Sequence, residues 1–75
     1  MKVVVNDETV EIDDQMTVAG LLESLGFPEK GIAVAVRGER SDGKYDDWSV
    51  IPRSQWNIAL NDGAKVEVVT AVQGG

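Results

Sequence analysis

One stretch of this chain carries a full set of helix signals, and strand-like segments lie on both sides of it. Thr17 is a candidate N-cap, because its hydroxyl can accept a hydrogen bond from an unpaired amide of the first turn. Four apolar residues then recur at helical spacing and predict one buried stripe: Val18, Leu21, Leu22 and Leu25. Gly26 suits the left-handed position after a helix, and Pro28 prevents the helix from continuing. The stripe of this helix has to be covered by the strands around it.

The segment before the helix predicts a β-hairpin. Residues 2–5 are a β-branched run, and residues 9–12 alternate between polar and apolar types. Asn6 and Asp7 lie between the two runs, and both residue types tolerate turn conformations.

The segment after the helix predicts two further strands. Residues 32–36 are continuously apolar, a pattern that favours a strand covered on both faces. Residues 65–70 alternate, and they follow the strong turn signal Asn-Asp-Gly at 61–63. A mixed sheet with the first and last strands side by side at its centre, and the helix across one face, would bury the apolar stripes. The sequence therefore predicts a two-layer α+β fold, as a single domain over residues 1–75.

A polar stretch interrupts the second half of the chain. Residues 40–49 predict a long exposed loop or an irregular hairpin, with Tyr45 and Trp48 as isolated aromatics. Aromatic residues are favoured at interfaces, but we expect these two to fold back onto the domain's own surface. Residues 52–56 predict a turn and a short helical turn, with Trp56 partly buried because exposing a whole indole is unfavourable.

The composition excludes several kinds of site and partner. The chain has no cysteine and no histidine, so thiol nucleophiles, disulfides, imidazole bases and the commonest metal ligands are absent. Thirteen acidic and seven basic residues give a net charge of −6, which disfavours nucleic acid and anionic membranes. The charge suits a basic protein partner, or it serves solubility alone. Without a signal-peptide pattern or an apolar run of about 20 residues, we expect a cytoplasmic protein, and we expect a monomer.

The remaining polar groups do not form a catalytic pattern. Asp13–Asp14 and Asp46–Asp47 are paired carboxylates, but neighbouring loop residues usually point apart and neither pair has calcium-loop spacing. We expect both pairs to be solvated. A domain of this size also has little room for a pocket of the usual ligand volume, so the sequence disfavours an enzyme.

The last residues of the sequence could carry the function instead. Gly74 and Gly75 have no side chains and could enter a narrow channel, and we expect residues 70–75 to form a flexible tail. The five residues after Thr70 reach at most roughly 17 Å when extended. Such a tail could place a carboxylate in a partner's active site while the folded body docks outside. The alternative is an inert, frayed terminus, which is common in small domains.

Four segments together resemble one known family. They are VVVNDE at 3–8, GIAVAVRGE at 31–39, PRSQW at 52–56 and LNDGAKVEVVTAVQGG at 60–75. In this order they resemble the ThiS family, the sulfur carrier proteins of thiamine biosynthesis. The pattern DG-x-x-VE-x-VTAV-x-GG at the end is the most specific part.

The resemblance implies a fold and a reaction. The fold would be the ubiquitin-like β-grasp. The Gly75 carboxylate would be adenylated by a ThiF-type enzyme that uses ATP and magnesium, and a cysteine desulfurase pathway would supply sulfur for a thiocarboxylate. The thiocarboxylate would deliver its sulfur to thiazole synthase, ThiG. Gly74 and Gly75 would be the active tail, and partners would hold Ala71, Val72 and Gln73. The chain would then be a substrate of partner enzymes, with no catalytic residue, metal or cofactor of its own.

The sequence departs from the family pattern at one place. Residues 40–51 intervene where ThiS-like sequences pass almost directly from the Gly-Glu pair to PRS-x-W, and we expect a surface loop there. Two alternatives stay open. The tail could serve another sulfur pathway, such as molybdopterin synthesis, or the chain could be a β-grasp interaction domain with an inert tail.

Overall fold

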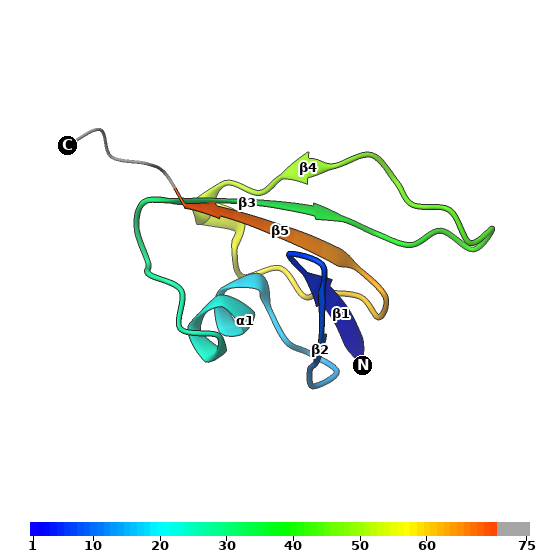
Figure 1. Cartoon of the computed structure of the whole chain (residues 1–75), viewed down its shortest axis with the longest axis horizontal. Helices are drawn as coiled ribbons and strands as arrows, with labels where there is room; N and C mark the ends of the chain where they lie inside the picture. Colours follow the sequence, from blue (N-terminus) through cyan, green and yellow to red (C-terminus); the bar gives the residue numbers. More distant parts are fainter. Residues whose placement is uncertain (71–75) are drawn as a thin grey trace.

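The computed structural model describes residues 1–70, which form a mixed five-stranded sheet with a helix on one face (Figure 1). The elements are β1 (Lys2–Val5), β2 (Glu8–Glu11), α1 (Val18–Ser24), β3 (Ile32–Arg37), β4 (Ser49–Val50), the 3-10 helix η1 (Arg53–Gln55) and β5 (Lys65–Thr70). The strand order is β2-β1-β5-β3-β4; β1 and β5 are parallel and the other neighbours are antiparallel. The predicted two-layer arrangement, with the first and last strands adjacent, is confirmed.

The predicted N-terminal hairpin is present, and its turn explains its sequence. Asn6 and Asp7 have φ of 48° and 68°, in the left-handed region that Asn and Asp tolerate better than most residues. Two such residues form the turn type whose twist matches the two flanking strands. Val3 pairs with Val10 across the hairpin, and Val3 is fully buried under the second layer.

Helix α1 begins as its sequence predicts. The Thr17 hydroxyl oxygen accepts a hydrogen bond from the Gly20 amide at 3.0 Å, and Val18, Leu21 and Leu22 are buried. Leu25 is 41% exposed, so its placement in the buried stripe was wrong. The helix ends at Ser24, and Leu25 is its C-cap residue, still in the αR conformation with its amide bonded to the Leu21 carbonyl.

The end of α1 is a Schellman motif. Gly26 has φ of 80°, the left-handed conformation that glycine adopts without a Cβ clash. The Phe27 amide donates to the Leu22 carbonyl at 3.0 Å, and the Gly26 amide donates to the Glu23 carbonyl at 3.1 Å. These bonds reverse the chain and lead it towards β3.

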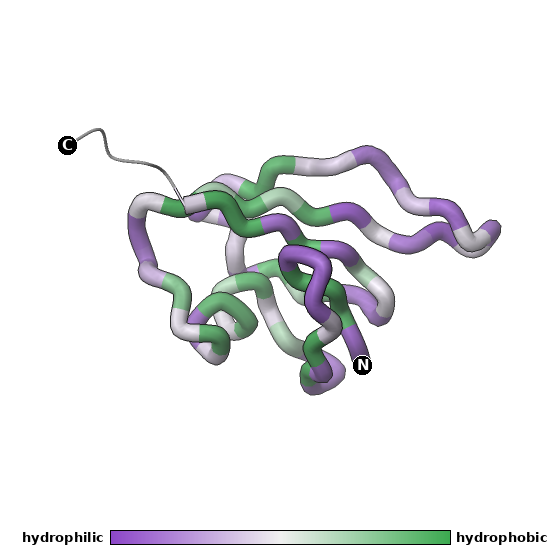
Figure 2. Tube along the Cα trace, viewed as in Figure 1, coloured by the Kyte–Doolittle hydropathy of each residue, from purple (hydrophilic) through white to green (hydrophobic). Residues whose placement is uncertain are grey.

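The core lies between α1 and one face of the sheet. Figure 2 shows hydrophobic residues along α1 and the central strands, and hydrophilic residues around the tip of the long hairpin after β3. The buried residues are Val3, Val5, Ile12, Val18, Leu21, Leu22, Val34, Trp56, Leu60, Ala64, Val66 and Val68. No helix in the described part of the chain is long and apolar enough to cross a membrane.

Strand β3 differs from its prediction. Val34 is 1% exposed, but Ala33 on the opposite face is exposed. The strand is therefore covered on one face only, because the helical layer lies on one side of the sheet. The alanines between the branched residues belong to the outer face.

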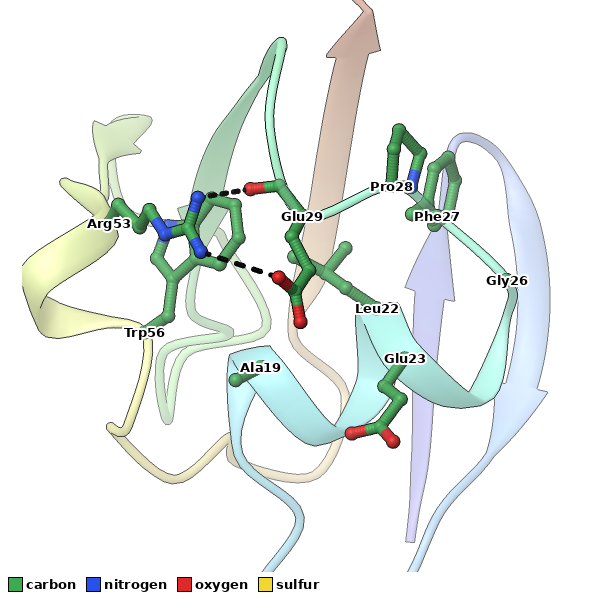
Figure 3. A pocket seen from close by; sticks show the side chains of 9 residues that line it. All are labelled: Ala19, Leu22, Glu23, Gly26, Phe27, Pro28, Glu29, Arg53 and Trp56. Atoms are coloured by element: carbon green, nitrogen blue, oxygen red, sulfur yellow. Dashed lines mark hydrogen bonds and ion pairs between the residues drawn. The ribbon is translucent and has the colours of Figure 1, made fainter.

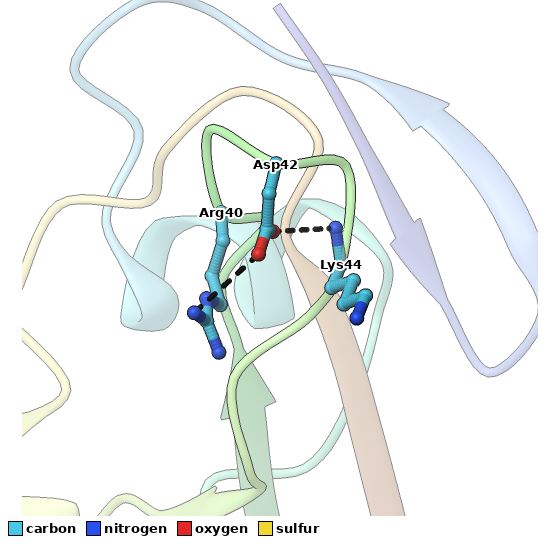
Figure 4. Close-up of polar contacts among 3 residues, drawn as sticks. All are labelled: Arg40, Asp42 and Lys44. Carbon is cyan, nitrogen blue, oxygen red and sulfur yellow. Dashed lines mark hydrogen bonds and ion pairs between the residues drawn. The ribbon is translucent and has the colours of Figure 1, made fainter.

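The polar stretch after β3 is an irregular hairpin, one of its two predicted forms. Glu39 forms a bridge with Tyr45, and β4 pairs with β3 through Val50 and Ala35. At the tip, Asp42 accepts a hydrogen bond from the Lys44 amide at 3.0 Å and pairs with the Arg40 guanidinium at 3.4 Å (Figure 4). Because these groups are solvent-exposed, the ion pair contributes little to stability.

The chain after β4 forms the predicted short helical turn, η1. Trp56 follows it and is only 8% exposed, so it is more deeply buried than predicted. Its indole N–H donates to the Ile51 carbonyl at 3.0 Å, which supplies the partner that a buried indole needs.

Candidate functional site

The five predicted site residues, Ala71, Val72, Gln73, Gly74 and Gly75, lie outside the residues that the structure describes. The structure describes the strand and the surface that lead to them. Strand β5 occupies the centre of the sheet, and its last residue, Thr70, pairs with Ile32 at the start of β3. Thr70 therefore belongs to the central strand, so the start of the predicted 70–75 tail at residue 70 was wrong.

The face of the sheet opposite α1 is partly apolar beside this exit. Cross-strand register places Ala33 beside Val69 and places Ala35 between Glu67 and Val50, all pointing away from the core. Val69 is 57% exposed and Val50 is 74% exposed, although both are large hydrophobic residues. We call Ala33, Ala35, Val50 and Val69 the apolar patch. Its place next to Thr70 makes it a candidate docking surface for a protein that receives the tail.

Two cations and two aromatic side chains continue the same face away from the exit. The Arg37 guanidinium lies 5.5 Å from the centre of the Tyr45 ring and 5.2 Å from that of Trp48. The Lys65 ammonium lies 4.5 Å from the Tyr45 ring centre. At these distances the ring faces attract the cations. We call these four residues the cation–aromatic cluster.

Tyr45 is held onto the domain's own surface, as predicted. Its hydroxyl donates to the Gly63 carbonyl at 3.1 Å, and the Arg37 side chain donates to the Asp46 carbonyl at 2.8 Å. Trp48 folds back only in part and stays 44% exposed. The ion pairs found within residues 1–70 involve neither Arg37 nor Lys65. This end of the face therefore suits an acidic group on a partner.

The sequence pattern indicates only part of the apolar patch. The alternation of residues 65–70 places Val69 on the side of β5 opposite Val66 and Val68. Ala33 was predicted as part of a strand covered on both faces, and Val50, next to Ile51 in a short apolar pair, carries no local signal for either face. An exposed position for both follows once α1 is known to cover one face only.

A hollow lies on the helical side of the molecule, between α1, its following loop and η1 (Figure 3). It is an open groove of about 490 Å³, so the surface offers more room than the small size of the domain led us to expect. Leu22, Phe27 and Trp56 line it with apolar surface. The Arg53 guanidinium donates to the Glu29 carbonyl and lies 3.8 Å from the Glu29 carboxylate.

The remaining polar candidates do not assemble into a reactive centre in the described chain. Asp13, Asp14, Asp46 and Asp47 are all exposed, which confirms the prediction that both pairs are solvated. Residues 1–70 contain no group of three or more carboxylates that could hold a metal ion.

Comparison with known proteins gives three results. The chain matches the sequence model of the ThiS family over residues 2–75. It is similar to a thiazole synthase of Paramagnetospirillum magneticum, with 36% identity over 76 residues. That match covers 100% of this chain and 20% of the relative, so the chain spans about a fifth of the relative's length.

The third similarity is structural. A crystal structure of the thiamine biosynthesis protein ThiS from Geobacter metallireducens matches this one with a TM-score of 0.71. The match covers 100% of both chains at 23% sequence identity, and it confirms the predicted β-grasp fold. The family match over residues 2–75 shows that the chain belongs to the ThiS family.

Proposed function

We propose that this chain carries sulfur for thiazole formation as a thiocarboxylate on Gly75. The observation that supports this most directly is the family match, which includes the Gly-Gly end. This role requires that Gly75 has a free carboxylate in the working protein. Gly74 and Gly75 would enter the partner's active site, while Ala71, Val72 and Gln73 would lie in the channel that leads there.

The proposed chemistry begins with activation. A carboxylate is a poor acyl donor, so an oxygen of the Gly75 carboxylate attacks the α-phosphorus of ATP, and pyrophosphate leaves. The product is an acyl adenylate. A sulfur nucleophile then attacks the carbonyl carbon and displaces AMP. If the nucleophile is a persulfide, a thiol must supply two electrons to release the thiocarboxylate.

The proposed partners follow from this sequence of steps. A ThiF-type enzyme would bind ATP and magnesium and carry out the adenylation, and a cysteine desulfurase pathway would supply the sulfur. The thiocarboxylate would then pass its sulfur to thiazole synthase, ThiG. Similarity of the whole chain to part of a protein named thiazole synthase supports this last partner.

The outer face of the sheet is the proposed docking surface for the activating enzyme. The apolar patch would supply contact area next to the exit from β5, and Arg37 and Lys65 would pair with acidic groups on the enzyme. Docking through this face would bring the tail to the active site without contact to the helical side.

Adenylation can be tested directly. The purified chain is incubated with a ThiF-type enzyme, magnesium and ATP labelled at the α-phosphate, and label on the chain is measured. We expect labelling that depends on magnesium and is absent from a variant lacking Gly75. Equal labelling of that variant would contradict the assignment to Gly75. If neither the ThiF-type enzyme nor a molybdopterin-type enzyme labels the intact chain, the result would favour the inert-tail alternative.

A further inference from the structure

Strand β5 is supported by β1 over only part of its length. The parallel register joins Val4 to Lys65 and Val5 to Val66, and the Asn6 amide donates to the Val66 carbonyl at 2.9 Å. At Asn6 the chain turns away into the hairpin, with φ of 48°. Strand β5 continues to Thr70, paired with β3 on its other side.

The side chain of Asn6 extends the interrupted ladder. Its Oδ1 accepts a hydrogen bond from the Val68 amide at 2.7 Å, and its Nδ2 donates to the Val68 carbonyl at 3.2 Å. One carboxamide therefore satisfies both the N–H and the C=O of Val68, as one residue of a paired antiparallel strand would. Val68 is 7% exposed and lies two residues before the end of β5.

We propose that Asn6 is a positioning residue that fixes the last residues of β5 and therefore the point from which residues 71–75 leave the domain. This role rests on the proposed function. Without the carboxamide, the end of β5 would be held by β3 alone. The outer face could still dock on a partner, but Gly75 would be presented over a wider range of positions. A reacting carboxylate held less well reacts more slowly even when binding is unchanged.

The residue type fits this role closely. Only a side chain with both an acceptor and a donor can match the two backbone groups of Val68, and Asn provides both. Asn also tolerates the positive φ of the turn. Asn6→Asp would keep the acceptor but place a carboxylate oxygen against the Val68 carbonyl. Asn6→Gly would keep the turn conformation and remove the side chain, which separates the two roles of the residue.

Asp62 provides a matched control at the other end of β1. Its Oδ1 accepts a hydrogen bond from the Lys2 amide at 2.8 Å, so it also joins distant parts of the chain through one side chain. It lies before β5, remote from Thr70 along that strand. Asp62→Ala therefore removes a comparable long-range contact without changing the end of β5.

The first test measures amide hydrogen exchange in the isolated protein by NMR. Loss of hydrogen bonding worth about 1.4 kcal/mol corresponds to about tenfold faster exchange of an amide that opens locally. We expect this increase at Val68 in Asn6→Gly, which removes the acceptor of the Val68 amide, with unchanged Val68 exchange in Asp62→Ala. Unchanged Val68 exchange in Asn6→Gly would overturn the positioning role.

The second test separates positioning from docking. In steady-state adenylation by the ThiF-type enzyme, Asn6→Gly should lower kcat about tenfold and leave KM for the carrier within about twofold. Asp62→Ala should match the wild type. A raised KM with unchanged kcat, or equal effects of both variants, would overturn the inference. An inactive wild-type chain would instead contradict the proposed function, and the exchange measurement would still decide whether Asn6 fixes the end of β5.

Discussion

Single residues in this domain differ sharply in what they contribute, even within one helix. Leu22 and Leu25 are the same residue type three positions apart, yet Leu22 is 3% exposed and Leu25 is 41% exposed. Leu22 lies within α1, whereas Leu25 is the C-cap residue at its end. Helical spacing alone predicted one buried stripe through both residues. Spacing does not show where the helix ends, so it could not distinguish the buried leucine from the exposed one.

Leu22→Ala should therefore destabilise the protein much more than Leu25→Ala. Truncating a buried leucine costs about 2–5 kcal/mol through lost burial and the cavity that remains. The exposed leucine has less burial to lose, so its truncation should cost under about 1 kcal/mol. Chemical denaturation of both variants measures the two values. Similar losses would mean that Leu22 is not a core residue.

The glycines at 74 and 75 should behave in the opposite way. We expect neither residue to pack, so Gly74→Ala and Gly75→Ala should leave the melting temperature unchanged. Both variants should slow adenylation, because a methyl group would obstruct a narrow channel to the active site. Thermal melts and labelling with ATP check the two parts. A melting temperature lowered by many degrees would contradict the proposed tail.

At the scale of the secondary-structure elements, the end of α1 depends on the left-handed backbone conformation of Gly26. Gly26 has φ of 80°, and a Cβ added there would meet no atom within 4 Å. A substitution at this position is therefore penalised by conformation and not by crowding. Gly26→Ala should cost about 1–2 kcal/mol, and Gly26→Asn should cost less because Asn tolerates this region. Equal stability of Gly26→Ala and the wild type in urea would be inconsistent with the Schellman motif.

A substitution on the outer face of the sheet should affect binding to the activating enzyme and not the stability of the fold. Val69 belongs to the apolar patch, whereas Ile58 is an exposed hydrophobic residue outside it that follows η1. Val69→Asp should raise KM for the activating enzyme about fivefold or more, because it places a charge in the contact area. Ile58→Asp is the matched control and should leave KM unchanged. Steady-state adenylation measures both, and equal effects would argue against docking through this face.

For the molecule as a whole, the sequence predicted the architecture better than it predicted surfaces. Local signals at Thr17, Gly26 and residues 61–63 marked element boundaries, because each depends on the conformation of a few neighbouring residues. Exposure of Ala33 and Val50 could not be predicted in the same way. It depends on which face of the sheet the helix covers, which is a property of the assembled domain.

The candidate site also has a part that the local sequence predicts and a part that depends on the assembled domain. The tail could be proposed from sequence, because its Gly-Gly end is a local pattern, and it still awaits a test since it lies outside the described residues. The Asn6 contact with Val68 joins residues 62 positions apart and had no sequence signal beyond a turn-forming residue. The groove beside Trp56 was missed because its walls come from α1, a loop and η1 together.

The most direct test of the carrier role is the mass of the protein after a complete reaction. The chain is incubated with ATP, magnesium, a ThiF-type enzyme, a sulfur donor and a thiol, and its intact mass and C-terminal fragments are measured. We predict a mass increase equal to the replacement of one oxygen by sulfur, confined to the fragment that contains Gly75 and absent without ATP. The control is that the ThiF-type enzyme is shown to be active on another carrier, and the reaction is repeated with a molybdopterin-type enzyme. An unchanged mass with both enzymes would contradict the proposed function.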